Sequence, residues 1–265
     1  ILRLWVSSSN FKEDVRVSDK ILKENAEVYR RIRNTSRYIL GNLSDFDPVA
    51  DKVAYEEMTE IDRWALLKLQ RLVAKAKEAY ETYEYHKIYH AVHNFCTVEM
   101  SSFYMDVLKD RLYTLNPEDE VRKSGQTAMY EILTTMIKIM SPILVHTAEE
   151  VWHHLPEGGH AETVFLEDWP ELKEDYLDQD LEAKWDELLA VRKDVSKALE
   201  LARNNKVVGH SLDALVKIYA DDKLYQFLDQ FDDLAELFIV SQVKLLKAED
   251  EVDLDNEYIG KETGI

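Results

Sequence analysis

The chain is poor in the two residues that most often interrupt helices. It holds seven glycines and five prolines among 265 residues, whereas glycine alone usually makes up about 7% of a globular protein. So few helix breakers exclude a fold made mostly of tight turns and favour long helices. Hydrophobic residues still account for 46% of the chain, so there is enough apolar material for a sizeable core.

Other absences narrow the class of protein. The single cysteine, Cys96, excludes an internal disulfide framework and fits a reducing compartment. No run of about 18 apolar residues and no signal-peptide pattern occur, so we expect no membrane span. The chain also lacks a glycine-rich phosphate loop, a nucleophile elbow and a paired-cysteine zinc motif. We therefore expect it to perform no covalent chemistry by itself. Because it opens at Ile1 in an apolar stretch, "ILRLWV", we expect a piece of a longer polypeptide.

Basic charge is scarce and unevenly distributed. The net charge of −19 disfavours nonspecific binding to nucleic acid. Residues 16–37 nevertheless hold seven basic and three acidic residues, whereas residues 149–187 hold fourteen acidic residues and two lysines. Residues 249–257 add six more acids. A nucleic-acid partner would therefore have to meet a local basic surface early in the chain.

Helical periodicity dominates the first part of the chain. We expect a short helix within residues 1–11, and then long helices from an N-cap at Ser18 to near Gly41, over 58–85 and over 86–115. A further helix should begin at Pro117, as its first residue, and reach about residue 140, with a kink at 141–142 before a last helical stretch to 155. In the first long helix, apolar or small residues recur at helical spacing at Val28, Ile32, Thr35, Ile39 and Leu43. Such helices with short connections predict a helical bundle.

The pattern changes after residue 155. An acidic stretch carries a possible short strand at "TVFLEDW", residues 163–169, and a helix should cover 180–205. The β-branched runs at 214–220 and 237–246 predict two strands, separated by a short helix at 222–235. The predicted fold class is mainly α: a helical bundle followed by a small α/β unit. We expect a linker at 1–17, the bundle at 18–155, an acidic connector at 156–180 and a partial α/β domain at 181–265.

The stretch "YRRIRNTSR" is the first candidate for contact with RNA. At 100° per residue, Arg30, Arg33, Asn34 and Arg37 share one helix face, opposite the apolar positions. Arg33 and Arg37 have no acid three or four residues away. Guanidinium groups bind phosphate through two hydrogen bonds, and Asn offers both a donor and an acceptor to a base edge. The alternative is a solvated face, or ion pairs with acids elsewhere in the bundle.

The stretch "SSFYMDVLKDRLY", residues 101–113, is the second candidate. Tyr104, Leu108 and Leu112 form an apolar line that Met105 and Val107 widen. The opposite side gathers Asp106, Lys109, Asp110 and Tyr113, with Arg111 at the border. Arg111 and Tyr113 could stack on or contact an unstacked RNA base. The alternative is ordinary Asp–Lys pairing on the surface of one helix.

The stretch "HKIYHAVHNFC" is a weaker candidate for a metal site. His86, His90 and His93 share one helix face, and Cys96 follows. All four would lie on one helix, and no glutamate stands between the first two histidines as in the metalloprotease pattern. A set of surface histidines is the favoured interpretation, and no metal site is expected.

Several of these stretches resemble one family. "ILRLWVSSSNFKEDVRVSDKILK" and "YRRIRNTSRYILGNLSDFDP" resemble the segment that follows the catalytic domain of bacterial-type isoleucyl-tRNA synthetases, which are class Ia aminoacyl-tRNA synthetases. "FCTVEMSSFYMDVLKDRLY" and "MSPILVHTAEEVWHHLP" are similar to parts of the anticodon-binding bundle of that family. "VRKDVSKALELARNNKVVGHSLDALVKIYA" is similar to the start of its C-terminal junction domain. The resemblance covers essentially the whole chain.

The resemblance implies a role in protein biosynthesis. A parent enzyme in the cytoplasm would activate isoleucine with ATP and Mg²⁺ and esterify tRNA(Ile), as a monomer without membrane contact. This chain would dock the anticodon stem-loop and would itself hold no cofactor. The catalytic and editing domains would precede it, and a zinc module would follow it.

The resemblance also implies roles for individual residues. In the related methionine enzyme an Asn and an Arg on the matching helix read the anticodon, and Asn34 and Arg37 lie near those positions. A large side chain of that enzyme maps near Arg111 or Tyr113. Arg3, Trp5 and Arg16 are similar in position to stem-contact or domain-interface residues. Two alternatives stay open: the same region of a valine or leucine enzyme, and a helical protein–protein adaptor with no RNA role.

Overall fold

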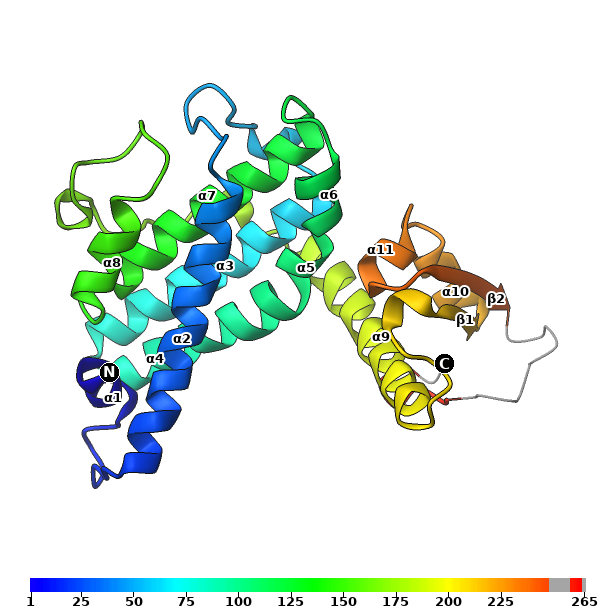
Figure 1. Ribbon diagram of the computed structural model, residues 1–265, viewed down its shortest axis with the longest axis horizontal. Helices are drawn as coiled ribbons and strands as arrows, with labels where there is room; N and C mark the ends of the chain where they lie inside the picture. Colours follow the sequence, from blue (N-terminus) through cyan, green and yellow to red (C-terminus); the bar gives the residue numbers. More distant parts are fainter. Residues whose placement is uncertain (248–257, 264–265) are drawn as a thin grey trace. The chain divides into compact units, whose positions relative to one another are not determined.

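The computed structural model describes residues 1–247 and 258–263 and divides into two compact units, Ile1–Asp178 and a second unit from Gln179 onward. The first unit is helical, and the second combines helices with two strands, which confirms the predicted fold class (Figure 1). In the described part of the chain, no helix is long and apolar enough to cross a membrane.

The first unit is a bundle of long helices with short breaks between them. Its α-helices are α1 Leu2–Ser8, α2 Asp19–Asn42, α3 Glu60–Glu81, α4 Tyr85–Asn94, α5 Met105–Val107, α6 Lys109–Thr114, α7 Glu120–Met140 and α8 Val145–Trp152. A π-helical segment, Phe95–Tyr104, joins α4 to α5. Short 3-10 turns lie at Tyr55–Glu57, Val164–Leu166 and Glu174–Tyr176.

Helix α3 is the centre of this bundle. It packs against α4, α7 and the π-helical segment. Its buried residues lie on every side rather than along one stripe, as expected of a helix enclosed by others; they are Ile61, Asp62, Trp64, Ala65, Leu66, Leu67, Leu69, Gln70, Leu72, Val73, Ala76 and Ala79. The neighbouring helices therefore take their positions from α3.

Helix α2 confirms the predicted start and the predicted buried face. Ser18 is the N-cap, and its hydroxyl accepts a hydrogen bond from the amide of Ile21. The five positions predicted at helical spacing are all buried: Val28, Ile32, Thr35, Ile39 and Leu43. The helix runs along the outside of the bundle (Figure 1), so the opposite face meets solvent.

Several predicted boundaries are wrong. Pro117 is not the first residue of α7, because Asp119 caps that helix by accepting from the amide of Val121 and the helix begins at Glu120. Residues 163–169 contain a 3-10 turn instead of a strand, since the Thr163 side chain caps it and Glu149 binds its start. The single helix predicted over 86–115 contains a π-helical segment and is interrupted at Leu108. The first two errors come from side-chain hydrogen bonds that compete with the regular pattern.

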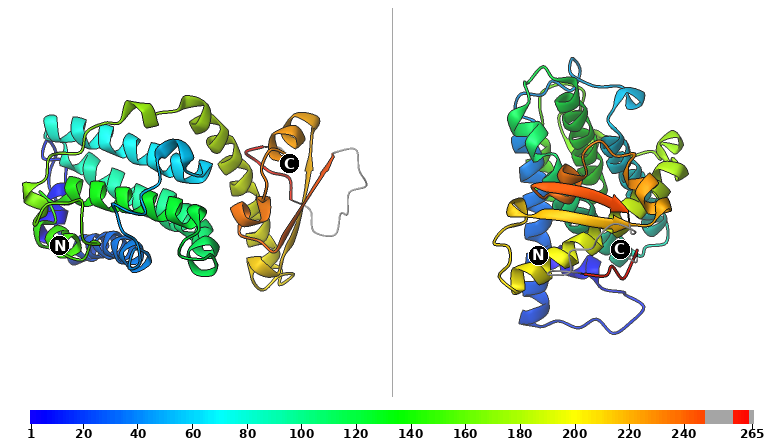
Figure 2. Two further views of the ribbon diagram at one scale, coloured as in Figure 1. Left: turned by 90° about the horizontal axis from the view of Figure 1, so that it is seen from above. Right: turned by 90° about the vertical axis from the view of Figure 1, so that its right-hand side faces the viewer.

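The second unit is built around a two-stranded parallel sheet. Helix α9, Gln179–Asn204, confirms the helix predicted at 180–205, and a 3-10 turn follows at Ser211–Asp213. Strand β1, Leu215–Ala220, pairs with β2, Gln242–Lys247, in the register Leu215↔Gln242 to Ala220↔Lys247. The strands lie side by side in the right-hand view of Figure 2. The parallel arrangement requires a crossover, which α10, Asp222–Leu228, and α11, Leu234–Phe238, provide.

The second predicted strand began too early, because residues 237–241 complete α11 and its turn. Ile239 ends that helix with φ of 57°, a left-handed conformation that is uncommon for a β-branched residue. Tyr83 and Lys206 end α3 and α9 in the same way, with φ of 59° and 60°. A chain with few glycines therefore ends three helices on residues other than glycine, at a cost of about 1–2 kcal/mol each.

A buried carboxylate joins three parts of the first unit. Asp62 is fully buried on α3, and its oxygens accept hydrogen bonds from the hydroxyls of Thr59 at 2.7 Å, Tyr104 at 2.7 Å and Ser124 at 2.6 Å. These donors come from the N-cap of α3, the end of the π-helical segment and α7. Burial and the charge of Asp62 hold the pKa of Tyr104 well above its usual value, so Tyr104 stays a donor.

Replacing Tyr104 by Phe removes one hydrogen bond to this carboxylate and keeps the ring. We expect Tyr104→Phe to lower the free energy of unfolding by about 1.5–3 kcal/mol, the usual range for a hydrogen bond to a charged group. Urea unfolding followed by circular dichroism measures the change. Tyr83→Phe is the matched control, because Tyr83 is 65% exposed and its hydroxyl makes no hydrogen bond with any residue that the structure describes. An equal loss in both variants would contradict the role of Asp62.

A second buried carboxylate, Asp194 on α9, holds the last described segment of the chain. It accepts hydrogen bonds from the amides of Lys261 at 3.0 Å and Thr263 at 3.0 Å and from the Thr263 hydroxyl at 2.8 Å. Burial alone would raise the pKa of Asp194, but the hydrogen bonds from Thr263 and its neighbours outweigh burial and lower it. The stabilisation from these bonds is therefore complete above the pKa of an Asp side chain in the unfolded chain, which is about 3.9. It is lost as the pH falls through the lower pKa that Asp194 has in the folded protein.

We expect the protection of amides 261–263 against hydrogen exchange to fall as the pH is lowered below about 4. In Asp194→Asn the same amides should already have low protection at pH 7, with little dependence on pH. The Asn side chain is neutral and has one acceptor oxygen, so it cannot accept all of the bonds that the carboxylate accepts. Hydrogen exchange with mass spectrometry, corrected for intrinsic exchange rates, makes the comparison. Protection that is equal in the two proteins at pH 7 would show that Asp194 does not hold this segment.

Candidate nucleic-acid interface

The outward face of α2 carries the predicted row of cations. Arg30, Arg33, Asn34 and Arg37, called here the outer stripe of α2, are all exposed, and the buried positions of the helix lie on the other side. Gly41 continues the stripe by one turn, and a Cβ placed there would meet nothing within 4 Å. The helix therefore presents an open surface with three guanidinium groups and one carboxamide.

The outer stripe of α2 makes only weak ion pairs within the protein, so its side chains are available to a binding partner. Arg30 pairs with Glu27 on the same helix, as the spacing predicts. Arg33 lies 3.7 Å from Glu150 of α8, and both side chains are about half exposed, at 47% and 57%. Arg37 and Asn34 make no ion pair or hydrogen bond with any residue that the structure describes. Exposed ion pairs contribute about 0–1 kcal/mol, so exchanging them for phosphate costs little.

The second candidate segment reaches the same end of α2 through two tyrosines. Its apolar line is buried as predicted: Tyr104, Met105, Val107, Leu108 and Leu112. Tyr113 on α6 projects into solvent and lies near Tyr38 of α2, whose hydroxyl donates to the Met105 carbonyl at 3.1 Å. Burial, the neighbouring Tyr113 hydroxyl and the Asp106 charge raise the pKa of Tyr38. Tyr113 therefore lies beside the outer stripe.

Sequence reasoning missed Tyr38. It follows Asn34 by one helical turn, and that spacing was the available signal. Its importance comes from Tyr113, which lies 75 positions further along the chain, and no local pattern contains that pairing.

The other predicted residues of this segment differ in orientation. Lys109 is exposed and pairs with Asp106 three residues earlier, which is the alternative considered for this helix. Arg111 is half-buried, and its Nη1 donates to Thr59 Oγ1 at 3.2 Å. Because Thr59 in turn donates to Asp62, the Arg111 head lies at the edge of the buried carboxylate cluster.

The three residues of the N-terminal stretch contact the fold in different ways. Arg3 donates to the carbonyls of Pro142 at 2.5 Å and Ile143 at 2.9 Å, just after α7. The Trp5 indole donates to the Arg16 carbonyl at 3.2 Å. The Arg16 side chain is exposed. Arg3 thus holds the stretch against the bundle, Trp5 joins the two ends of the stretch, and Arg16 presents its charge to solvent.

The histidines of α4 do not form a metal centre with Cys96. His93 stacks on Tyr89, and burial, Arg31 and His90 lower its pKa. Cys96 is fully buried with its Sγ 3.4 Å from Met136 Sδ, and burial raises the pKa of its thiol to about 12. Within residues 1–247 and 258–263, no three His, Cys, Asp or Glu side chains come together in a group that could hold a metal ion.

Comparison with known proteins identifies the domain. Residues 62–219 match the family described as the anticodon-binding domain of tRNA ligase. The match begins at Asp62, so α2 precedes it, but relatives align over nearly the whole chain. An isoleucine–tRNA ligase of Natranaerobius thermophilus is 52% identical over 94% of this chain, and one of Carboxydothermus hydrogenoformans is 50% identical over 100% of it. The chain spans 27% and 28% of the length of these two relatives. The comparison confirms the predicted resemblance, and the chain belongs to the anticodon-binding domain family of tRNA ligases.

Proposed function

We propose that this chain docks the anticodon stem-loop of tRNA(Ile) as part of an isoleucine–tRNA ligase. Its membership of the anticodon-binding family and its identity of about half to proteins named isoleucine–tRNA ligase support this function. The whole enzyme would activate isoleucine with ATP and transfer it to the tRNA. Docking of the anticodon end would place the acceptor end at the active site.

The outer stripe of α2 is the observation that carries the proposal. Arg37 is an exposed guanidinium without an ion pair among the described residues, and a free guanidinium suits bidentate contact with phosphate. Asn34, one turn from Arg30 and Arg37, offers both a donor and an acceptor to a base edge. Tyr113 adds an exposed ring on which an unstacked base can lie.

The remaining predicted residues take supporting roles in the proposal. Arg30, Arg33 and Lys109 exchange weak surface ion pairs for phosphate contacts. Arg111 acts from within the bundle, because its head contacts Thr59. Arg16 can reach the RNA stem, whereas Arg3 and Trp5 hold the N-terminal stretch that carries it. We assign 1–17 to stem contact, 18–155 to anticodon binding, 156–180 to an acidic connector and 181–265 to a junction domain.

Other parts of the polypeptide would supply the chemistry. ATP with Mg²⁺ belongs to the catalytic domain and zinc to a separate module, and the whole enzyme would work as a cytoplasmic monomer. The strongly acidic remainder of this chain would limit retention of other nucleic acids, because repulsion acts everywhere except at the outer stripe. Because contacts between cations and phosphates carry the attraction, the affinity should fall steeply with salt.

Binding of the 265-residue chain to an isoleucine tRNA transcript tests the proposal. We expect Arg37→Ala to weaken binding about tenfold, or roughly 1.4 kcal/mol, and to reduce the salt slope by about 0.7–0.9, the value for one phosphate. Asn34→Ala should reduce the preference for isoleucine tRNA over a noncognate tRNA, because one base contact gives about 1–3 kcal/mol of discrimination. Fluorescence anisotropy at several salt concentrations measures both.

Lys77→Ala is the matched control, because Lys77 is an exposed cation on α3 and the same charge is removed there. It should leave binding within about twofold. An equal loss in Lys77→Ala and Arg37→Ala would mean that bulk charge, not the outer stripe, determines affinity. No binding of the unaltered chain at low salt would favour the helical adaptor without an RNA role.

A further inference from the structure

A buried arginine lies between the two segments of the candidate interface. Arg122 on α7 is 9% exposed. Its Nη2 pairs with Asp45 Oδ2 at 2.8 Å, just beyond the end of α2. Its Nε donates to the Leu112 carbonyl of α6 at 3.2 Å, one residue before Tyr113. One guanidinium thus contacts both the segment after α2 and the segment that carries Tyr113.

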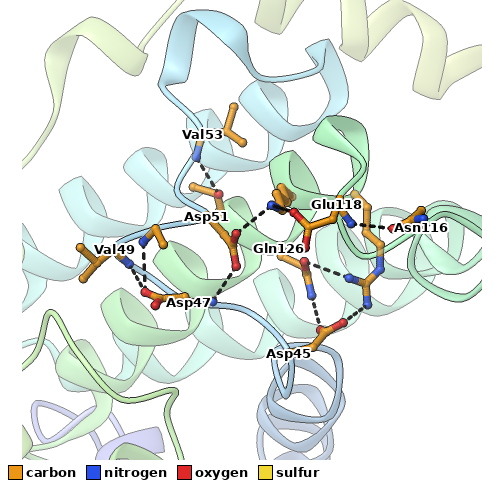
Figure 3. Close-up of polar contacts among 12 residues, drawn as sticks. Asp45, Asp47, Val49, Asp51, Val53, Asn116, Glu118 and Gln126 are labelled. Atoms are coloured by element: carbon orange, nitrogen blue, oxygen red, sulfur yellow. Dashed lines mark hydrogen bonds and ion pairs between the residues drawn. The ribbon is translucent and has the colours of Figure 1, made fainter.

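Gln126, one turn further along α7, completes the connection to α2. Its Nε2 donates to the Asn42 carbonyl at 2.9 Å, which is the last residue of the helix, and to Asp45 Oδ1 at 2.9 Å. Its Oε1 accepts from Arg122 Nη1 at 3.4 Å. Figure 3 shows Gln126 and Asp45 facing each other across this contact. Gln126 is 1% exposed, and its bonds to Asn42 and Asp45 are partly buried.

The geometry requires a guanidinium. The planar head of arginine presents donors in several directions, whereas a lysine ammonium is a single point charge on a flexible stem. A lysine at 122 could reach Asp45 or the Leu112 carbonyl, but not both with the spacing that Arg122 gives. Burial alone would raise the pKa of Asp45, but hydrogen bonds from Gln126 and Arg122 outweigh burial and lower it, so the carboxylate stays charged.

We propose that Arg122 is a positioning residue that fixes the spacing between the outer stripe of α2 and Tyr113, so that both segments contact the same RNA loop. The inference rests on the proposed function for the RNA itself, but the spacing can be measured without RNA. Asp45 and Gln126 act with Arg122 because they attach the end of α2 to the same side chain. The adjacent Lys123 pairs with Asp51 and Glu118 instead, and neither contact involves α2 or α6.

A double-mutant cycle separates positioning from simple destabilisation. In the unaltered chain we expect Tyr113→Ala to weaken tRNA binding about tenfold, as for the loss of one stacked base. In an Arg122→Lys background the same change should weaken tRNA binding by less than about twofold. Tyr113 and α2 would then no longer have the spacing that lets both contact the same RNA loop. Asp45→Asn, at a side chain that is 40% exposed, should also reduce the cost of Tyr113→Ala, but by less than Arg122→Lys does.

Lys123→Ala is the matched control for this cycle. It lies next to Arg122 on α7 and also loses two ion pairs, at a side chain that is 18% exposed. Tyr113→Ala should still cost about tenfold in that background. Additive costs of Arg122→Lys and Tyr113→Ala, or the same loss of coupling in Lys123→Ala, would overturn the proposal.

A distance measurement tests the spacing without RNA. Spin labels at Gly41→Cys and Asp110→Cys report on the end of α2 and on α6, and the native Cys96 stays unlabelled because it is fully buried. We expect Arg122→Lys and Asp45→Asn to broaden the distance distribution and Lys123→Ala to leave it narrow. A narrow, unchanged distribution in Arg122→Lys would overturn the inference even if the chain binds tRNA. Broadening without any tRNA binding would support the spacing and refute the proposed function alone.

Discussion

The hydrogen bonds to the Asp62 carboxylate determine which way the second candidate segment faces. Asp62 is enclosed on the central helix, and an unpaired charge there would cost several kcal/mol. The hydroxyls of Thr59, Tyr104 and Ser124 satisfy it and so bring α3, the π-helical segment and α7 together. Once Tyr104 points inward, Tyr113, nine residues later, projects outward. The exposed ring beside α2 therefore follows, nine residues later, a tyrosine that is held inward by a buried carboxylate of α3.

Each of the two units uses its few buried charges at junctions between elements. Asp62 joins helices through neutral hydroxyls, Arg122 joins the end of α2 to α6, and Asp194 holds the last described segment on α9. The exposed arginines of α2 have weak partners or none among the described residues. This division separates stability from binding, because the groups that hold the fold are buried and those proposed to meet RNA face solvent.

Much of the first unit could be predicted because its signals are local. Ser18 starts α2 by capping it, and the spacing of Val28, Ile32 and Ile39 determines its buried face. The errors have local causes too. The Asp119 cap displaces the start of α7 from Pro117, and the contacts of Glu149 with the 163–166 turn replace a strand. Residues 237–241 read as a strand because of their β-branched side chains, yet they complete α11.

Sequence by itself determined the residue types on α2, their exposure and the excess of acid elsewhere, because a helix of known period has only one way to bury its apolar stripe. Tertiary structure alone decided that Tyr113 meets Tyr38, that Arg111 turns toward Thr59 and that Arg122 spans Asp45 and Leu112. Most of these contacts join residues tens of positions apart. Even the ten-residue contact from Arg122 to Leu112 crosses between two helices, so helical periodicity, which relates only neighbours on one helix, contains no information about any of them.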